Sequence, residues 1–556
     1  MAGTGDLLSI GVSGLQAFQR NLSTVGHNIS NVNTEGYSRQ TVQMAARNPQ
    51  STGNGFIGAG VGVESTRRVY DQFQFNQVVS RNSTFNQLDT LRQLASGVDE
   101  ILANDDAGLN PVLQNFFNAL QDVSNNPTSI PARQVLISEA DTLTNRFVSL
   151  DQRFTELRDS INSQLQTVTT EINNIAGSIA ELNSSITLAT GSSGGLPPND
   201  LLDQRDVLIN RLSELVSVST VPAGDNSVNV FIGSGQTLVL GTNVSTIGTI
   251  RSEFDRSQLE VSYTSSTSNY AISDQITGGK LGGLLAVRNE ILDPVQNALG
   301  RIAIGLASTF NAQHQLGDDV NGNPGGLFFS AVDTTSPEVF SSTGNNPASG
   351  TISVAISDTN NIKPSDYRLN YDGATFTLVR LNDNTIVDSG FTTGDFPRMV
   401  AVDGITLNVA GSVAAGDSFL IRPVKNAGRD IRVAIASASE FAAAASGNSL
   451  GDNSNVLALA ALQSQNVLGG GTESYQLAYS TLVATIGART NQANINSNAQ
   501  ETLLRRAVES QQAVSGVNLD EEAANLIKFQ QAYQAAAQVI RISDEIFQTL
   551  LSATSR

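Results

Sequence analysis

The sequence predicts a multidomain, mainly α-helical protein in which both chain ends build a coiled-coil or bundle shaft and β-rich outer domains are inserted into it. Three observations predict this class. Apolar residues near both ends of the chain alternate in steps of three and four, which is the spacing of a coiled-coil seam. A longer seam of the same kind runs through residues 154–186. Two stretches, 216–263 and 317–423, instead carry the β-branched residues and alternating patterns typical of strands.

The first helix is expected between residue 8 and about residue 30. Its apolar seam consists of Leu8, Leu15, Phe18, Leu22, Val25 and Ile29, with Gly11 at the one skipped position. A stretch that includes Asn28, Asn31 and Asn33 then leads to Gly36 and Tyr37, so the helix should end near Ser30 in an Asn-rich loop. A single apolar stripe has nothing to bury against, and this helix therefore needs a partner.

The C-terminal end of the chain offers a matching seam. It consists of Leu526, Phe529, Tyr533, Ala536, Ile540, Ser543, Phe547 and Leu550. The acidic residues at 520–522 precede it and suit a helix N-terminus. The simplest inference is that the two termini pair with each other or with copies of themselves. Periodicity alone leaves an ordinary helix hairpin in a globular core equally open.

Residues 44–215 are expected to form a hairpin followed by helices. The glycine-rich stretch 44–69 favours an extended hairpin or loop. Helical spacing follows from residue 73, with a break at Pro127, and the seam at 154–186 predicts a helix about 50 Å long. After a Gly- and Pro-rich break, Asn199 or Asp200 is expected to cap the next helix.

The second half alternates between β structure and helix. The second β stretch contains two alternating runs joined by Asp372-Gly373, which predicts a hairpin turn. The Ala-rich stretch 431–514 is expected to be helical, with a loop at 446–455 and a break at 469–471. The resulting division is an axial helix and loop (1–75, pairing with 510–556), helical shaft (76–215), β insertion (216–279), shaft return (280–316), outer β domain (317–429), shaft (430–509) and C-terminal axial helix (510–556).

Composition excludes several classes of function. With 556 residues the chain is too long for one hydrophobic core. Its formal charge of -19 and the lack of a run of Lys or Arg argue against nucleic acid as a partner. Residues 1–41 contain Asp6, Glu35, Arg20 and Arg39, whose charges cancel, so this segment is cheap to desolvate and suits an assembly surface.

The chain has no cysteine, which excludes disulfides, thiolate catalysis and most structural zinc sites. No basic segment followed by an apolar one opens the sequence, and no apolar run is long enough to span a membrane. We therefore expect no membrane insertion, and any export should use a route without a cleaved signal peptide.

Two glycine motifs match known sites only as strings. Gly53-x-Gly55-x-x-Gly58 resembles a dinucleotide fingerprint, but a β-like run follows it where a helix is required. Gly191-x-Ser193-x-Gly195 resembles a nucleophile elbow, but a helix precedes it where a strand is required. The second motif is better explained as a loop between helices, and neither predicts a cofactor or a nucleophile.

The remaining candidates for chemistry are two histidines and one acidic loop. His27 and His314 are the only histidines, and each is better explained as structural than as catalytic or metal-binding. Asp319, Asn321 and Asn323 alternate as in a calcium loop, but the Gly and Glu that such a loop needs are missing, which favours a tight turn. We therefore predict no catalytic residue, no cofactor and no metal.

The chain carries two terminal motifs and four interior motifs that can be compared with known families. Asn28-Ile-Ser-Asn-Val-Asn-Thr-Glu-Gly-Tyr37 and Asn518-Leu-Asp-Glu-Glu-Ala-Ala-Asn-Leu-Ile-Lys-Phe-Gln-Gln-Ala-Tyr-Gln-Ala-Ala-Ala-Gln-Val-Ile540 resemble the terminal signatures of bacterial flagellar rod, hook and hook-associated proteins. The interior motifs resemble the hook-associated protein 1 family, the hook-filament junction proteins. They are Phe116-Phe-Asn-Ala-Leu-Gln-Asp-Val-Ser-Asn-Asn-Pro127 with Pro131-Ala-Arg-Gln134, Asn199-Asp-Leu-Leu-Asp-Gln-Arg-Asp206, Gly278-Gly-Lys-Leu-Gly-Gly-Leu-Leu-Ala-Val-Arg288 and Gly322-Asn-Pro-Gly-Gly-Leu-Phe-Phe329.

This resemblance implies a structural protein of the extracellular flagellum, exported unfolded through the flagellar type III apparatus. It implies a ring or tube of copies at the distal end of the hook, with hook protein below and the second junction protein above. It also implies an export chaperone that binds the C-terminal helix before secretion. The assembly interface would consist of the two terminal seams together with Asn28, Asn31, Asn33, Gly36 and Tyr37.

Two alternatives stay open at this point. A hook or rod axial protein would share the terminal motifs. A surface adhesin or glycan-binding protein would instead use the β region 317–423.

Overall fold

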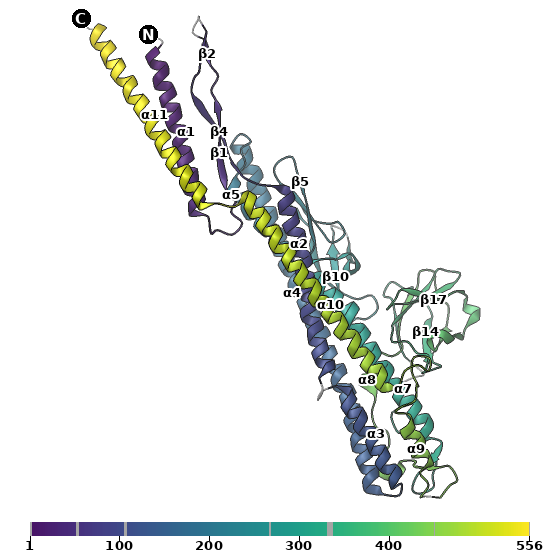
Figure 1. Ribbon diagram of the computed structural model, residues 1–556. Coiled ribbons are helices and arrows are strands. Elements are labelled where there is room, and N and C mark those ends of the chain that lie inside the picture. Colours follow the sequence, from purple (N-terminus) through teal and green to yellow (C-terminus); the bar gives the residue numbers. More distant parts are fainter. Residues whose placement is uncertain are drawn as a thin grey trace.

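The chain forms a long helical shaft that carries both termini at one end and a β domain on its side (Figure 1). The structure is a computed structural model that describes residues 3–51, 55–104, 108–265, 268–330, 337–449 and 451–554, with side chains from residue 6 onward. The architecture confirms the predicted class, a mainly helical protein with inserted β structure.

The two termini pair within one chain. Helix α1 (Gly3–Ser30) ends where the Asn-rich loop predicts, and it lies antiparallel beside α11 (Leu519–Thr554) (Figure 1). A hairpin follows α1, packs along it and confirms the extended prediction for this stretch. Its strands are β1 (Gln40–Ala46), β2 (Gln50–Ser51), β3 (Phe56–Ile57) and β4 (Val61–Arg68).

The shaft consists of helices from three separate parts of the chain. They are α2 (Gln72–Ala103), α3 (Leu109–Asn125), α4 (Ile130–Ser192), α5 (Asn199–Leu215), α6 (Gly279–Val287), a π-helical turn (Arg288–Leu292), α7 (Asp293–His314), α8 (Ala427–Asp430), α9 (Ser454–Ala461) and α10 (Tyr475–Ser515). Helix α4 has 63 residues, which makes it about 95 Å long, longer than the seam alone predicts. Ser129 caps its start, and Leu136, Leu143 and Phe147 extend the buried face. None of the described helices is both long and apolar enough to cross a membrane.

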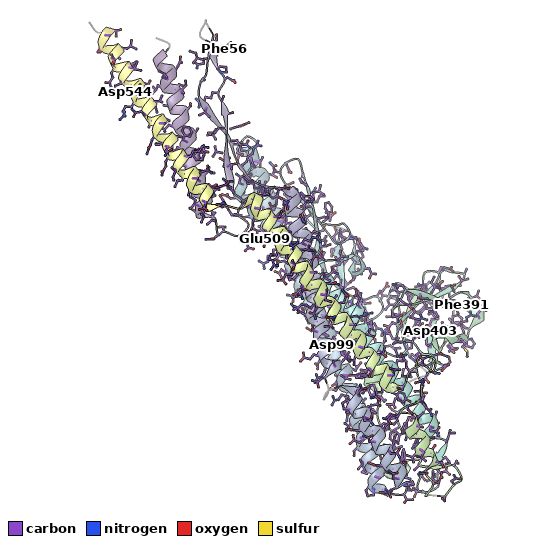
Figure 2. All side chains as sticks on the ribbon, viewed as in Figure 1. Phe56, Asp99, Phe391, Asp403, Glu509 and Asp544 are labelled. Carbon is purple, nitrogen blue, oxygen red and sulfur yellow. The ribbon has the colours of Figure 1, made fainter. Side chains whose placement is uncertain are left out.

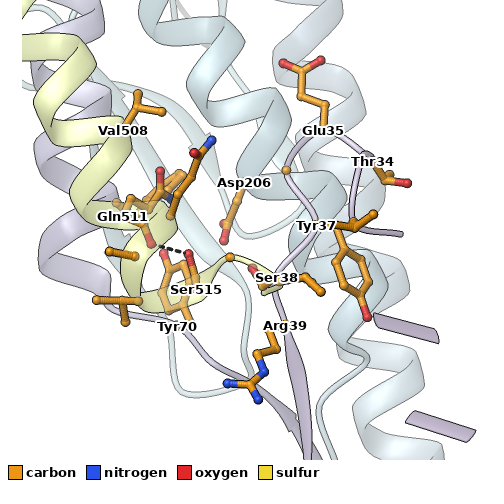
Figure 3. A pocket seen from close by; sticks show the side chains of 18 of the residues that line it. Thr34, Glu35, Tyr37, Ser38, Arg39, Tyr70, Asp206, Val508, Gln511 and Ser515 are labelled. Carbon is orange, nitrogen blue, oxygen red and sulfur yellow. Dashed lines mark hydrogen bonds between the residues drawn. The ribbon is translucent and has the colours of Figure 1, made fainter. Parts of the chain in front are cut away.

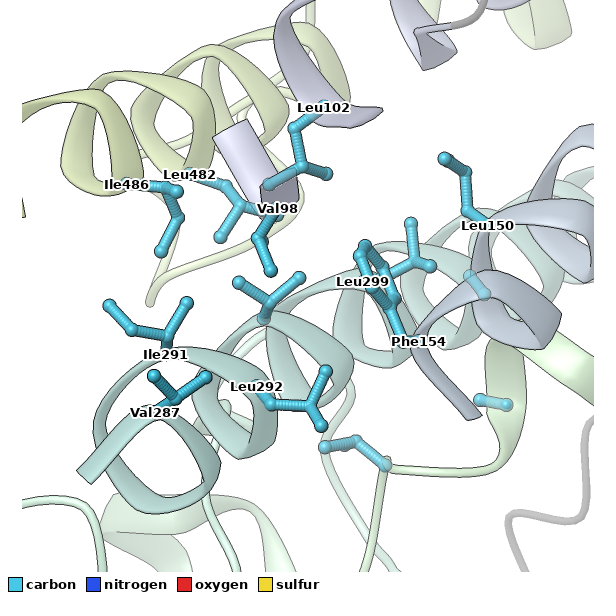
Figure 4. Close-up of a cluster of buried hydrophobic side chains, with 14 of the residues drawn as sticks. Val98, Leu102, Leu150, Phe154, Val287, Ile291, Leu292, Leu299, Leu482 and Ile486 are labelled. Atoms are coloured by element: carbon cyan, nitrogen blue, oxygen red, sulfur yellow. The ribbon is translucent and has the colours of Figure 1, made fainter. Parts of the chain in front are cut away.

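Apolar side chains from distant segments build the shaft core. Figure 4 shows Val98 of α2, Phe154 of α4, Leu299 of α7 and Ile486 of α10 directed into one cluster, and all four are buried. Burying a side chain of this kind contributes about 1.5–3 kcal/mol. Helices that are far apart in the sequence, from α2 to α10, therefore share one core.

The first β insertion packs against one face of α4. Three asparagine side chains of α4 form hydrogen bonds with backbone groups of this insertion. Asn173 donates to the Ile247 carbonyl (2.6 Å) and accepts from its amide (3.0 Å), and Asn183 pairs in the same way with Val228 (2.9 and 3.1 Å). Asn162 donates to the Ser257 carbonyl at 3.0 Å. The strands are β5 (Val218–Pro222), β6 (Val228–Ile232), β7 (Gln236–Leu240), β8 (Asn243–Val244), β9 (Thr246–Arg251), β10 (Leu259–Thr264) and β11 (Asn269–Ala271).

The outer β domain contains a five-stranded sheet in the order β13-β20-β15-β16-β17 and a three-stranded sheet in the order β14-β19-β18. The predicted hairpin is present, and the Asp372 carboxylate accepts the amides of Ala374 and Thr375, both at 2.7 Å, in its turn. The strands are β13 (Glu338–Ser341), β14 (Thr351–Ile356), β15 (Tyr367–Tyr371), β16 (Phe376–Arg380), β17 (Thr385–Phe391), β18 (Arg398–Val400), β19 (Ile405–Ala410) and β20 (Ser418–Arg422).

One buried arginine joins the two β insertions. Arg422 of β20 bonds Asp255 of the first insertion at 2.6 Å and Asp366 of its own domain at 3.2 Å. Its side chain is 5% exposed, and the two carboxylates are 8% and 10% exposed. A charge buried this deeply is tolerated only because it is paired. The cluster therefore holds the outer domain against the body of the molecule.

Two local predictions are wrong. Residues 431–445 are mostly not helical, because buried side chains occupy backbone groups that a helix would need: Arg133 donates to the Phe441 carbonyl, and the Ala442 amide donates to His314. This stretch contains a 3-10 turn (Ala438–Glu440) and β21 (Ala444–Ala445), which pairs with β12 (Gly317–Asp318). Helix α5 is capped by neither Asn199 nor Asp200, since Pro198 holds the N-cap and Asn199 donates to the Thr66 carbonyl at 3.0 Å.

The buried His314 should make this end of the shaft sensitive to acid. Burial lowers its pKa, and the nearby Arg133 guanidinium lowers it further, against a hydrogen bond to the Gly326 carbonyl. The unfolded chain therefore takes up a proton that the folded chain excludes, so stability is complete above the unfolded pKa of about 6.5 and falls below it. Thermal melts from about pH 7 to 5 should show this loss. His314→Gln should abolish it, whereas the exposed His27→Gln should retain it; equal slopes in both variants would contradict the assignment.

Candidate assembly interface

Two glycines of α1, Gly11 and Gly14, face α11 directly. A Cβ atom built on Gly11 would lie 2.8 Å from Cγ1 of Ile540, and one on Gly14 would lie 3.7 Å from the Cβ of Ala536. Contacts under 3.0 Å are not tolerated between real Cβ atoms and their neighbours. The skipped seam position at Gly11 is therefore the place where α11 inserts a side chain.

The predicted interface residues differ widely in their burial within one chain. Val25 and Asn28 are buried. Partly buried are Leu15, Phe18, Leu22, Ile29, Asn31, Tyr37, Leu526, Phe529, Tyr533 and Ile540. Exposed are Leu8, Asn33, Gly36, Phe547 and Leu550. A single copy thus brings the two seams together without covering them.

The fully buried side of α1 carries small and polar residues and faces the hairpin. Ser13, Ala17, Asn21 and Thr24 are buried there. The Ser13 hydroxyl accepts the Val61 amide at 3.3 Å. Sequence reasoning missed this contact because it searched for a periodicity of large apolar residues, and these side chains are polar or, in Ala17, small.

Asn28 connects three segments through its side-chain amide. Its Nδ2 donates to the Gln40 carbonyl at 2.9 Å and to Oε2 of Glu522 at 3.1 Å. Its Oδ1 accepts the Tyr37 hydroxyl at 2.7 Å and the Gln40 amide at 2.9 Å. Both donors and both acceptor positions of the amide are therefore used, and only Asn or Gln could supply them. This geometry explains the Asn at this point of the terminal motif.

Glu522 is the buried charge of the terminal unit, defined as α1, the hairpin and α11. Its side chain is 2% exposed, and it accepts Nε of Arg39 at 2.8 Å. A second nitrogen of Arg39 lies 2.8 Å from Glu521. Burial raises the pKa of the neighbouring Tyr37 hydroxyl, and the carboxylates around it raise it further, so Tyr37 stays a neutral donor. The signal for this pairing was present in the sequence, since charges are rare near the N-terminus.

The terminal unit meets the shaft at a polar joint. The Arg39 amide donates to the Ser515 carbonyl at 2.9 Å, and the Ser38 amide donates to Asp203 of α5 at 3.0 Å. Arg68 bonds Asp203 at 2.9 Å and Asp206 at 2.7 Å. The chain crosses the joint twice, at 69–71 and at 516–518.

A cavity of about 990 Å³ lies at this joint, between the loop 32–39 and the end of α10 (Figure 3). Its titratable lining consists of Glu35, Tyr37, Arg39, Tyr70, Asp206, Glu509 and Glu521. No histidine lines it, so it lacks the usual proton carrier near neutral pH. The lining provides polar contacts but no nucleophile with a neighbouring base.

The two glycine motifs and the acidic loop at Asp319 form ordinary turns and loops where the structure describes them. Gly53 lies outside the described residues, and strand β3 follows Gly55 where a nucleotide site needs a helix. The Ser193 hydroxyl donates to the Leu196 carbonyl at 2.7 Å in the loop after α4, as predicted. Asp319 accepts the amides of Asn321 (2.7 Å) and Asn323 (2.9 Å), which confirms a tight turn. Within the described ranges, no three acidic or histidine side chains cluster as metal ligands would.

The sequence matches four family models along its length. Residues 95–329 match "Flagellar hook-associated protein FlgK helical domain", and residues 340–423 match "Flagellar hook-associated protein 1, D2-like domain". The termini match models shared with the rod: residues 8–37 match "Flagella basal body rod protein" and residues 510–553 match "Flagellar basal body rod FlgEFG protein C-terminal". The rod-type models thus cover the paired helices, and the hook-associated models cover the outer domain and the part of the shaft within residues 95–329.

Full-length relatives agree with the family models. Flagellar hook-associated protein 1 of Salmonella typhimurium is 36% identical over 98% of this chain and 99% of its own length. The Escherichia coli protein of the same name is 35% identical over the same shares, and that of Bacillus subtilis is 27% identical over 97% and 96%. The structure of the flagellar hook junction protein FlgK from Burkholderia pseudomallei superimposes with a TM-score of 0.74 at 28% identity, over 79% of this chain and all of that one. The chain therefore belongs to the flagellar hook-associated protein 1 family, whose members are structural proteins of the hook-filament junction and not enzymes.

Proposed function

We propose that the terminal unit is the surface through which copies of this chain join one another and the neighbouring axial proteins. The observation that carries this proposal is the exposure of α11. Only Glu522, Ala536 and Ser543 are buried among its 36 residues. Large apolar side chains along the helix, including Ile527 and Phe547, stay more than half exposed. Large apolar side chains exposed along one helix in this way mark a surface that other protein chains cover.

The hairpin supports the same role. Phe56 near its tip is 76% exposed and lies at the same end of the molecule as Asp544 of α11 (Figure 2). A two-stranded hairpin that projects from its own chain is marginally stable in water. Contacts with further copies would cover both features together.

The proposed mechanism is folding coupled to assembly. The terminal helices order fully only when neighbouring subunits bury their seams, and this burial offsets the entropy lost on ordering. Removal of residues 1–41 or 520–556 should leave a soluble monomer with an intact shaft that cannot enter the flagellum. Circular dichroism and hydrogen exchange test the mechanism, because strong protection of α1 and α11 in the isolated full-length monomer would contradict it.

A charge on either seam should block assembly without unfolding the shaft. Phe18→Asp and Ile540→Asp each place a carboxylate in the α1–α11 contact, where desolvation without a partner costs several kcal/mol. The expected result is loss of the protein from purified flagella with an unchanged melting temperature of the shaft. Immunoblots of isolated hook-basal bodies and thermal melts of the monomer provide the two measurements. Normal amounts of either variant in the flagella would refute the role of the seam.

The position in the flagellum is also part of the proposal. We place the protein at the distal end of the hook, between hook protein and the second junction protein, after unfolded export without a cleaved signal peptide. An export chaperone would bind the apolar face of α11 before secretion. Immunogold labelling restricted to the hook tip is the expected result, and labelling along the rod or hook would overturn the placement. Retention of a cytosolic chaperone by residues 510–556, but not by the same segment with Ile540→Asp, tests the second point.

A further inference from the structure

Two long faces of the shaft are almost free of charge, although the whole chain has a formal charge of -19. Residues 475–500 of α10 include one charged side chain, Arg489, and its guanidinium donates to the Glu290 carbonyl of the same chain. Residues 160–180 of α4 also include one, Glu171, which pairs with Arg211 of α5 at 2.9 Å. In both faces the single charge is already bound within its own chain.

The outward face of α10 carries two exposed apolar anchors. Leu477 is 49% exposed and Ile495 is 55% exposed. Their separation in sequence equals about five helical turns, so the two side chains lie on one line along the helix. The exposed residues between them on this line are small or uncharged: Thr481, Ala484, Ala488 and Gln492.

Four hydroxyl groups on these faces already have partners within their own helices. On α4, Ser163, Thr167 and Thr170 donate to the carbonyls four residues earlier at 2.9, 3.1 and 2.9 Å. On α10, Thr485 does the same at 2.7 Å. A hydroxyl that is bonded to its own backbone needs no water, so covering it leaves no donor unsatisfied. These four groups are therefore cheaper to desolvate than free hydroxyl groups would be.

Other helices of the shaft lie between α10 and α4. Helix α2 contacts α10 and also contacts α5 and α6, and these two helices in turn contact α4. A contact between two different faces repeats from copy to copy, and such head-to-tail contacts close into a ring when the rotation permits. Two copies with the same net charge repel each other, and neutral faces avoid that repulsion.

We propose that the outward face of α10 in one copy packs against the outward face of α4 in the next copy around the junction. This inference rests on the proposed assembly function and assigns the lateral contact of the shaft to named surfaces. The occupant is a second copy of this chain, because α10 continues through 516–518 into α11 and a neighbour bound at the terminal unit is carried along the adjoining shaft.

Cysteine cross-linking in isolated flagella tests the contact, and the chain has no cysteine of its own. The full-length variant with both Ile495→Cys and Thr170→Cys is treated with a flexible bismaleimide. The expected product is a ladder of multimers, with none from either single variant. Dimers from the Ile495→Cys variant alone would overturn the head-to-tail arrangement. A lack of ladder in flagella that contain the double variant would overturn the contact itself, while the terminal-unit proposal would stand.

A second test of the contact measures how much of each charge variant enters the flagellum. Ile495→Glu and Thr170→Glu should each lower the amount of protein in isolated flagella at least about tenfold, because an unpaired charge is buried in the contact. Asn145→Glu on α4 and Ser510→Glu on α10 are exposed positions outside the two faces and should be incorporated normally. Normal incorporation of both face variants would refute the inference. Thermal melts of the monomers confirm that each variant is folded.

Discussion

Replacement of Gly11 by leucine is expected to exclude the chain from the flagellum while its shaft melts as before. Gly11 faces Ile540 at a distance that leaves no room for a Cβ atom, so a leucine would force α11 away from α1. Losing this contact removes the burial of the adjoining seam, and assembly should fall by more than about a hundredfold, equivalent to about 3 kcal/mol. Motility assays and immunoblots of isolated hook-basal bodies measure the loss.

Gly26 provides the matched control on the same helix. A Cβ atom at Gly26 would meet nothing within 4 Å. Gly26→Leu therefore gains the same helix propensity, about 0.5–1 kcal/mol over glycine, without the collision. If the two variants assembled equally well, the close approach of α1 and α11 would have no role in assembly.

Arg422→Met should produce the largest loss of stability in the molecule. The substitution leaves Asp255 and Asp366 buried without their shared cation, and breaking a buried pair in this way costs about 3–5 kcal/mol. The outer β domain should then unfold before the shaft, as a separate transition in calorimetry and as early cleavage within residues 337–423 by protease. A single transition at the temperature of the unmodified chain would contradict this assignment.

Arg398→Met is the control for the loss of charge itself. Arg398 pairs with Asp388 in the same domain, but its side chain is 38% exposed and water can replace the partner. Its removal should leave the melting profile nearly unchanged. Equal destabilisation by both substitutions would mean that burial does not set the importance of Arg422.

The sequence predicted the helical framework because that information is periodic and local. The seams of α1, α4 and α11, the loop after Ser30 and the hairpin turn at Asp372 all follow from side-chain spacing and turn chemistry. The matching seams of the two ends predicted that they pair with each other or with copies of themselves, and left an ordinary core hairpin open. The family motifs then identified the function that geometry alone could not supply.

The failed predictions share a physical cause. Residues 431–445 have a helical composition, but His314 and Arg133 occupy their backbone groups, and these partners lie more than a hundred residues away in sequence. The same holds for the bond between Asn28 and Glu522, which unites opposite ends of the chain. Single-sequence patterns contain no signal for a contact that depends on one polar side chain meeting one distant group.

The two chain crossings at 69–71 and 516–518 have a mechanical consequence. A unit attached by one flexible linker can spin freely about it, whereas a unit attached at two separate points can only bend about the line between them. The terminal unit should therefore transmit torque to the shaft instead of swivelling under it. Cutting one crossing, for example by a protease site placed at 516–518, would leave the helices in place, and the bonds of Ser38 and Arg68 to α5 and the remaining crossing would then resist the torque.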